Sequence, residues 1–179
     1  MKNPLYFEMN LEFRRISEFP RGTLCALLAD AYSFDCRCAR HWGDDWREFD
    51  GFFFDNPRIA DRCGFISVLG GRAAGFASWD PRRLPEYTAI GHNCIAAEFK
   101  GRGCGAAQLR EAVARILREK PARITVTTSG LLVPAQRMYE SAGFREFRRR
   151  EDGGFAGELI DYEYRLRPER PDGNGPGRL

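Results

Sequence analysis

The stretch CIAAEFKGRGCGAAQL, residues 94–109, carries the strongest structural signal in the chain. It begins apolar, becomes charged, and then places glycines at 101, 103 and 105 ahead of an apolar periodicity typical of a helix. A glycine-rich loop entered from a strand and left through a helix directs backbone N–H groups toward an anion at the positive end of the helix dipole. We therefore expect an anion site here, most often one for phosphate.

Three interpretations of this loop stay open on its residues alone. The first is a cradle for phosphate or pyrophosphate. The second is a dinucleotide-binding turn, whose fingerprint has GxGxxG spacing and an acidic residue after the next strand. The third is a purely structural turn tightened by glycines. The glycines here run GxGxG, and the next predicted strand ends in Thr127, Thr128 and Ser129, which disfavours this second interpretation.

Length and composition predict one globular domain. The 179 residues, 43% of them hydrophobic and 13% aromatic, can bury a core without disulfides. The 28 basic and 25 acidic residues leave a formal charge of +3, which argues against a dedicated nucleic-acid or membrane-surface binder. We expect a domain over residues 1–167 and a loose, Pro- and Gly-rich tail over residues 168–179.

The chain shows no sign of a targeting segment or a metal centre. MKNPLYFEMN lacks the apolar core of a signal peptide, and no stretch approaches the roughly 18 apolar residues of a membrane span, so a cytoplasmic protein is expected. The six cysteines are scattered, and reduced thiols are expected. Cys36, Cys38 and His41 lack a second ligand pair at zinc-finger spacing, so no metal is expected.

Strand and helix signals alternate along the chain, and the segment DNP at 55–57 reads as a turn. Apolar alternation and β-branched runs predict strands within residues 5–16, 65–69, 73–79, 88–95, 123–129, 144–150 and 158–166. Helical spacing of apolar residues predicts helices within residues 23–34, 41–54, 103–120 and 135–142.

Two motifs, KGRGCG at residues 100–105 and AQRMYESAGF at residues 135–144, together resemble the signature of the GNAT N-acetyltransferase superfamily, and the resemblance spans roughly residues 63–150. In that family a strand leads into R/Q-x-x-G-x-G/A and then a helix. AQRMYESAGF, residues 135–144, is similar to the family's second segment, A-x-x-x-Y-x-x-x-G-F. The first motif corresponds here to Lys100, Gly101, Arg102, Gly103, Cys104 and Gly105.

The resemblance implies an α/β (α+β mixed) fold with a central mixed, mostly antiparallel sheet of about seven strands flanked by helices. The sheet would be splayed between strands 4 and 5, with acetyl-CoA in the gap as co-substrate. The backbone of Ile95 and Ala97 would hold the pantetheine arm, and the N–H groups of residues 101–105 would hold the pyrophosphate. The expected cofactor-binding residues are Ile95, Ala97, Lys100, Gly101, Arg102, Gly103, Cys104, Gly105 and Ala135.

Two positions depart from the family pattern. Lys100 stands where the family usually has Gln or Arg, and because that contact is largely with backbone we expect little effect. Leu132 stands seven residues before Tyr139, where the family often has Asn. The group that this Asn would contact must therefore be held in another way.

Tyr139 is the residue expected to take part in the chemistry. When an amine attacks a thioester, the departing sulfur gains negative charge, and a phenol with a pKa near 10 can hydrogen-bond to it or protonate it. The similar tyrosine of the family does this. The alternative is an aromatic near a helix end that only anchors the core.

The base that accepts the proton of the acceptor is less well defined. His92 has a suitable imidazole, with an intrinsic pKa near 6.5. Strand alternation places it on the face opposite Ile95, however, whereas Asn93 would face the cofactor with Ile95. A bulge in this strand would reverse that assignment. Glu86, Glu98 and a water chain are the alternatives.

The acceptor is expected near the aromatic and acidic residues between the first two strands, because aromatics beside carboxylates suit a cationic amine. The alternative, which the helical spacing favours, is that the aromatics belong to the core and the acids to a solvated face. These residues are Trp42, Trp46, Phe52, Phe53, Asp44, Asp45 and Asp55.

Together these signals predict an acetyl-CoA-dependent N-acetyltransferase that acetylates a primary amine by direct attack in a ternary complex. The expected partner is a small-molecule amine or a protein amine, without nucleic acid or membrane, and both monomer and homodimer stay open. A non-catalytic acyl-CoA-binding or regulatory domain is the main alternative. A nucleotide-binding oxidoreductase is the third possible function, and it would bind NAD better than acetyl-CoA.

Overall fold

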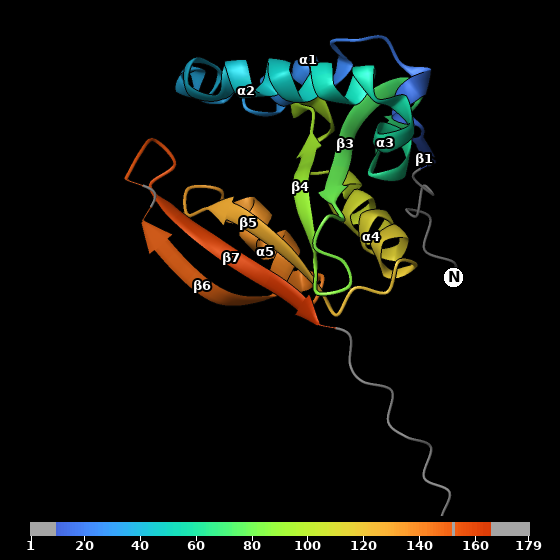
Figure 1. Ribbon diagram of the computed structural model, residues 1–179. Coiled ribbons are helices and arrows are strands. Elements are labelled where there is room, and N and C mark those ends of the chain that lie inside the picture. The colour runs from blue at the N-terminus through green and yellow to red at the C-terminus, as the bar shows by residue number, and fades with distance from the viewer. Residues whose placement is uncertain (1–9, 152, 166–179) are drawn as a thin grey trace, which may run out of the picture.

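Within the part of the chain that the structure describes, one sheet has seven strands in the order β1-β2-β3-β4-β5-β7-β6 (Figure 1). The structure is a computed structural model that describes residues 10–151 and 153–165. β4 and β5 pair in parallel and all other neighbours pair antiparallel, which confirms the mixed, mostly antiparallel sheet. The strands are β1 (Leu11–Arg14), β2 (Gly64–Leu69), β3 (Arg72–Asp80), β4 (Thr88–Ile95), β5 (Arg123–Ser129), β6 (Arg145–Glu151) and β7 (Glu158–Arg165).

Helices flank the sheet on both faces. Neighbouring strand residues such as Phe65 and Ile66, or Phe76 and Ala77, belong to different apolar clusters, as the alternation of side chains in a strand requires. α1 and α2 pack in one cluster, and α4 and α5 contribute most helical residues of the other. The helices are α1 (Thr23–Ala31), α2 (Cys36–Asp55), α3 (Pro57–Arg62), α4 (Cys104–Leu117) and α5 (Val133–Ser141), with short 3-10 turns η1 (Ile16–Glu18) and η2 (Ala97–Phe99).

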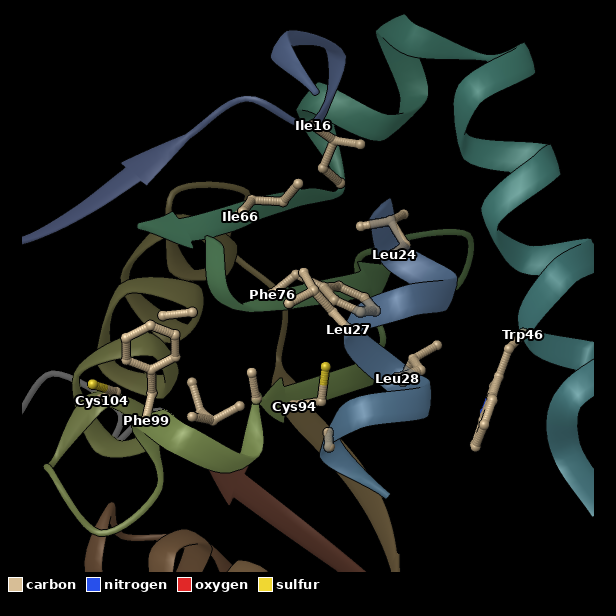
Figure 2. Packing of buried hydrophobic residues seen from close by; sticks show 14 of the residues in the cluster. Ile16, Leu24, Leu27, Leu28, Trp46, Ile66, Phe76, Cys94, Phe99 and Cys104 are labelled. Carbon is tan, nitrogen blue, oxygen red and sulfur yellow. The ribbon is translucent and has the colours of Figure 1, made fainter. Parts of the chain in front are cut away.

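The cluster under α1 ties this helix to the strand that leads into the glycine loop. Leu24 and Leu28 are fully buried on α1, and Figure 2 shows the leucines of this helix beside Phe76 of β3 and Cys94 of β4. Trp46 reaches the same cluster from α2. Burying side chains of this size contributes about 1.5–3 kcal/mol each, so the position of β4 is fixed by packing.

Most predicted elements are confirmed, and the differences have local causes. α2 begins at Cys36, earlier than expected, because the side chain of Asp35 caps the helix by accepting a hydrogen bond of 2.9 Å from the Arg37 N–H. The expected turn at 55–57 is wrong in part, because Pro57 begins α3 at the position where proline suits a helix. Gly143 ends the α5 segment with φ +93°, as its placement predicted.

The sheet opens between β4 and β5. Their register covers only three pairs, Thr88 with Ile124, Ala89 with Thr125, and Ile90 with Val126. Beyond Ile90, β4 continues along β3 while β5 continues along β7. The register between β3 and β4 also shifts at this point, so Gly91 forms a bulge where the strands part. This arrangement confirms the expected splay.

Some predictions lie at or beyond the limits of the described residues. The expected tail over residues 168–179 falls entirely outside them, and the described part of the N-terminal strand is β1. Among residues 10–151 and 153–165, no helix is long and apolar enough to cross a membrane.

Candidate functional site

The glycine loop leaves the N-terminus of α4 without a side-chain cap. Gly101 and Gly103 have φ values of +73° and +82°, a left-handed conformation that glycine adopts without steric cost. Gly103 is the N-cap residue, and because it has no side chain it makes no side-chain cap hydrogen bond. Orphan amides at the positive end of a helix are suited to bind an anion. The backbone conformation is therefore compatible with the anion cradle predicted from the sequence.

The lack of a Cβ atom at Gly105 also serves packing. A Cβ atom at this position would lie 3.2 Å from Sδ of Met138 and 3.6 Å from Cγ1 of Ile95. The first of these contacts is tighter than a Cβ atom normally tolerates. The lack of a side chain at Gly105 therefore lets α4 approach α5 and β4 closely.

The backbone N–H and C=O groups of the final β4 residues point alternately toward β3 and toward the opening between β4 and β5. Ala96 N–H donates a hydrogen bond of 2.8 Å to the carbonyl oxygen of Ala74, so its neighbour Ile95 has its N–H and carbonyl on the opposite edge. That edge faces the gap left by β5. The open backbone edge at Ile95 is what the expected contact with a pantetheine arm requires.

Two contacts fasten the loop to the end of α1. The N–H of Ala97 donates a hydrogen bond of 2.6 Å to Oδ2 of Asp30, so this expected cofactor donor already has a partner. Nζ of Lys100 donates to the carbonyl oxygen of Ala31 and lies 5.3 Å from the ring centroid of Phe34. Lys100 thus holds α1 against the loop.

The remaining predicted cofactor residues lie around the same helix end. Arg102 is exposed, with its guanidinium 5.8 Å from the ring centroid of Phe99. Cys104 is buried and shares the α1–α2 cluster with Phe99, as Figure 2 shows. Ala135 lies in the first turn of α5 and packs, partly buried, against the α4–α5 cluster.

Tyr139 and Asn93 meet beside the opening. Tyr139 is only 5% exposed, and the side chain of Asn93 lies close to its phenol. Burial raises the pKa of Tyr139 well above its usual value, the nearby phenol of Tyr32 raises it further, and the side chain of Asn93 lowers it slightly. Burial also raises the pKa of Tyr32 to about 12. Both phenols therefore keep their protons at neutral pH.

His92 lies on the opposite face of β4 from Asn93. Its ring centroid is 4.5 Å from that of Phe49 and 5.7 Å from that of Phe76. The bulge at Gly91 precedes both residues, so His92 and Asn93 keep the alternation expected for them. Burial among these aromatics lowers the pKa of His92 to about 4, which makes the imidazole a weak base.

His92 should make stability depend on pH. Because its folded pKa of about 4 lies below the ordinary 6.5, the unfolded chain binds more protons between these values. The free energy of unfolding should therefore fall as the pH drops from 6.5 toward 4, and be insensitive to His92 above that window. Denaturant titrations at several pH values should give a flatter curve for His92→Gln than for the wild type. His41→Gln controls for loss of an imidazole, and parallel wild-type and His92→Gln curves would contradict the shift.

The other two candidate bases lie away from the phenol. Glu98 forms an ion pair with Arg72 on the exposed side of the loop, and Glu86 is exposed in the segment before β4. Neither carboxylate has a hydrogen bond to Tyr139 or Asn93 among those of the described residues.

The candidate acids of α2, Asp44, Asp45 and Asp55, are exposed, whereas Asp50 is buried and accepts hydrogen bonds from the start of α1. Asp44 pairs with Arg47 and is 95% exposed, and Asp55 pairs with Arg21. Trp46 and Phe53, by contrast, are buried in the α1–α2 cluster, and Phe52 is half exposed. The structure therefore separates the carboxylates from the buried aromatics, as the alternative interpretation expected.

A group of aromatic residues joins the β6–β7 loop to the start of α2. The ring centroid of Phe155 lies 5.3 Å from that of Trp42 and 5.5 Å from that of His41. Arg37 lies over the same ring at 5.0 Å, and Tyr32 packs on Trp42 at 5.7 Å. We call Tyr32, Trp42 and Phe155 the aromatic wall. Phe155 was missed from the sequence, although an aromatic within the glycine-rich segment GGFAG was a usable signal.

No group of three or more His, Cys, Asp or Glu side chains in the described part of the chain is arranged to hold a metal. None of the six cysteines, all of which lie among the described residues, forms a disulfide; Cys36 is exposed and Cys38 is buried.

Comparisons with known proteins agree with this geometry. A model of the acetyltransferase (GNAT) family matches residues 25–144. No match was found among curated proteins.

Similar solved structures show the same fold. A GNAT-family protein from Desulfovibrio desulfuricans is 21% identical, with a TM-score of 0.70, and the match covers 87% of this chain and 98% of that one. The ribosomal-protein-S18-alanine N-acetyltransferase of Escherichia coli is 16% identical, with a TM-score of 0.65 over 90% and 96%. A GNAT-family acetyltransferase from Elizabethkingia anophelis, solved with acetyl-CoA bound, is 14% identical, with a TM-score of 0.60 over 87% and 97%.

Proposed function

Because the chain belongs to the GNAT acetyltransferase family, we propose that it transfers the acetyl group of acetyl-CoA to a primary amine by direct attack in a ternary complex. One observation carries the proposal: a buried phenol, Tyr139, lies beside the side chain of Asn93, in the part of β4 that has parted from β5. A protonated donor stands there beside an unpaired strand edge.

The residues present fit acetyl-CoA. The uncapped amides of α4 and the left-handed glycines at 101 and 103 would bind the pyrophosphate. The free edge of β4 at Ile95 would bind the pantetheine arm through main-chain hydrogen bonds. Bound in this way, the cofactor supplies an activated acyl group as a thioester. For the Ala97 N–H to bind the cofactor as well, its hydrogen bond to Asp30 would first have to break.

The chemistry needs charge stabilisation at sulfur. The lone pair of the acceptor nitrogen forms the new C–N bond while the C–S bond breaks, and its electron pair stays on sulfur. Tyr139 would donate its O–H to that sulfur. The raised pKa of this phenol lies above the value near 8.5 of a thiol, so its proton stays largely on oxygen. Tyr139 therefore acts as a hydrogen-bond donor, and the proton released by the amine goes to solvent or to the thiolate.

The acceptor would approach along the aromatic wall. Trp42 and Phe155 lie in contact there, and Arg37 already stacks on Phe155, so this surface can hold a cationic group. We propose a small-molecule amine as the acceptor. A protein amine would use the same wall and the same direct attack.

Release of CoA thiol across a panel of small amines and peptides tests this proposal. We expect acetyl-CoA to bind and thiol release to depend on the concentration of at least one amine. Binding without any amine-dependent release would instead support the non-catalytic acyl-CoA-binding domain. Calorimetry with NAD in place of acetyl-CoA tests the oxidoreductase alternative, since only that alternative expects NAD to bind more tightly.

A further inference from the structure

Gln108 is a fully buried amide on the inner face of α4. It is 0% exposed, on a stripe otherwise occupied by Leu109, Ala112 and Ile116. A polar residue at such a position costs stability unless its hydrogen bonds are made. This breach of the apolar pattern was visible in the sequence, but its partners could not be identified there.

Every polar atom of Gln108 has a partner. Nε2 donates to three oxygens: the carbonyl of Phe76 at 2.9 Å, the carbonyl of Cys94 at 3.1 Å, and Oδ1 of Asn93 at 2.7 Å. Oε1 accepts a bond of 2.7 Å from the Ser67 hydroxyl, which is itself fully buried. The network therefore links α4, β2, β3 and β4 to the residue that contacts Tyr139.

The carbonyl groups of Phe76 and Cys94 fix the orientation of two side-chain amides, those of Gln108 and Asn93. A carbonyl oxygen can only accept, so the nitrogen end of Gln108 must face Phe76 and Cys94. The group of Asn93 that faces this nitrogen must then be its oxygen, because two N–H groups would repel each other. The Nδ2 end of Asn93 is left to face Met138, at 3.7 Å from its sulfur, and the phenol of Tyr139.

We propose that Gln108 is a positioning residue that makes Tyr139 a donor, a role that rests on the proposed function. Asn93 donates to the phenol oxygen, and the phenol proton is therefore directed away from Asn93 and toward the bound sulfur. Without Gln108 the Asn93 amide can turn over, so that its oxygen accepts the phenol proton. Asn93 and Tyr139 would remain in contact, but the phenol O–H would then bond to Asn93 and could not donate to the sulfur.

Gln108→Met tests the proposal, because methionine keeps the length of the side chain and removes both N–H groups. We expect kcat to fall about tenfold, with acetyl-CoA affinity changed by less than about twofold. In a Tyr139→Phe background the same substitution should change kcat by less than about twofold, because there is no phenol to orient. Equal losses of kcat in the two backgrounds would overturn the proposal and leave Gln108 a structural residue.

Bound CoA gives a second measurement that needs no acceptor. The pKa of its thiol, followed by the ultraviolet absorbance of the thiolate, should rise by about one unit in Gln108→Met and should be the same in Tyr139→Phe as in the double variant. An unchanged thiol pKa in Gln108→Met would overturn the proposal even in an active enzyme. A raised thiol pKa in a protein that acetylates no amine would support the inference while the proposed function failed.

Two further variants guard against a folding defect. Ser67→Ala removes the other hydrogen bond of Gln108 but leaves Nε2 on Asn93, so we expect the thiol pKa to match that of the wild type. If Gln108→Met does not fold, Gln108→Glu replaces it at the same size. Its neutral acid can donate a hydrogen bond and its ionised form cannot, so the kcat of Gln108→Glu should be near the wild-type value at low pH and fall below it as the carboxyl group ionises. A kcat lowered by the same factor at every pH would overturn the proposal.

Discussion

Tyr139→Phe should lower kcat by about a hundredfold or more while leaving the affinity for acetyl-CoA unchanged. The substitution removes only the hydroxyl, and the ring keeps its contacts with Phe144 at 5.7 Å and Tyr162 at 6.1 Å. The fold and the cofactor site should therefore be preserved while the departing sulfur loses its donor. Single-turnover rates and calorimetric dissociation constants for acetyl-CoA separate the two effects.

Tyr162→Phe is the matched control for this experiment. Tyr162 is also buried, but its hydroxyl donates to Oε1 of Glu140 at 3.0 Å. Removing it should leave kcat near that of the wild type. If Tyr139→Phe turned over as fast as Tyr162→Phe, Tyr139 would have no part in the reaction.

Gly103→Leu should weaken acetyl-CoA binding by on the order of a hundredfold or more, since charge-assisted hydrogen bonds contribute about 1.5–3 kcal/mol each and at least two would be lost. Gly103 is the N-cap of α4 with φ +82°, where a side chain is strained and stands in front of the orphan amides. Calorimetric titration with acetyl-CoA measures the loss directly.

The strain itself needs its own control, and α1 provides one. Gly22 is the N-cap of α1 with φ +93°, nearly the same backbone conformation, and a Cβ atom there would meet nothing within 4 Å. Gly22→Leu should lower stability about as much as Gly103→Leu, by about 1–2 kcal/mol, yet bind acetyl-CoA normally. Equal losses of affinity in the two variants would mean that strain, not access to the amides, explains the effect.

The sequence predicted most accurately the structural features that depend on residues close together in the chain. The hairpin of β2 and β3, the bounds of β4 and β5, and the glycines of the loop all follow from local turn chemistry and periodicity. α3 was missed because Pro57 reads equally well as the end of one segment and the start of the next.

Contacts between distant segments could not be read from the chain. The bond between Asp30 and the Ala97 N–H, and the contact of Phe155 with Trp42, depend on where whole elements come to rest. The low pKa of His92 likewise comes from burial beside Phe49, which belongs to another helix. The splay itself was expected only from the resemblance to a family, because no residue type encodes the end of a strand pair.

The opening between β4 and β5 exists because main-chain pairing stops after three positions, not because particular side chains line it. No single side-chain substitution can close such an opening, and a ligand held by amides and carbonyls tolerates drift in the surrounding residues. Anchorage of the acyl donor and choice of the acceptor are thereby assigned to different parts of the molecule. Loops such as the one that carries Phe155 can change in sequence, and the acceptor can change with them, while the binding of the acyl donor stays the same.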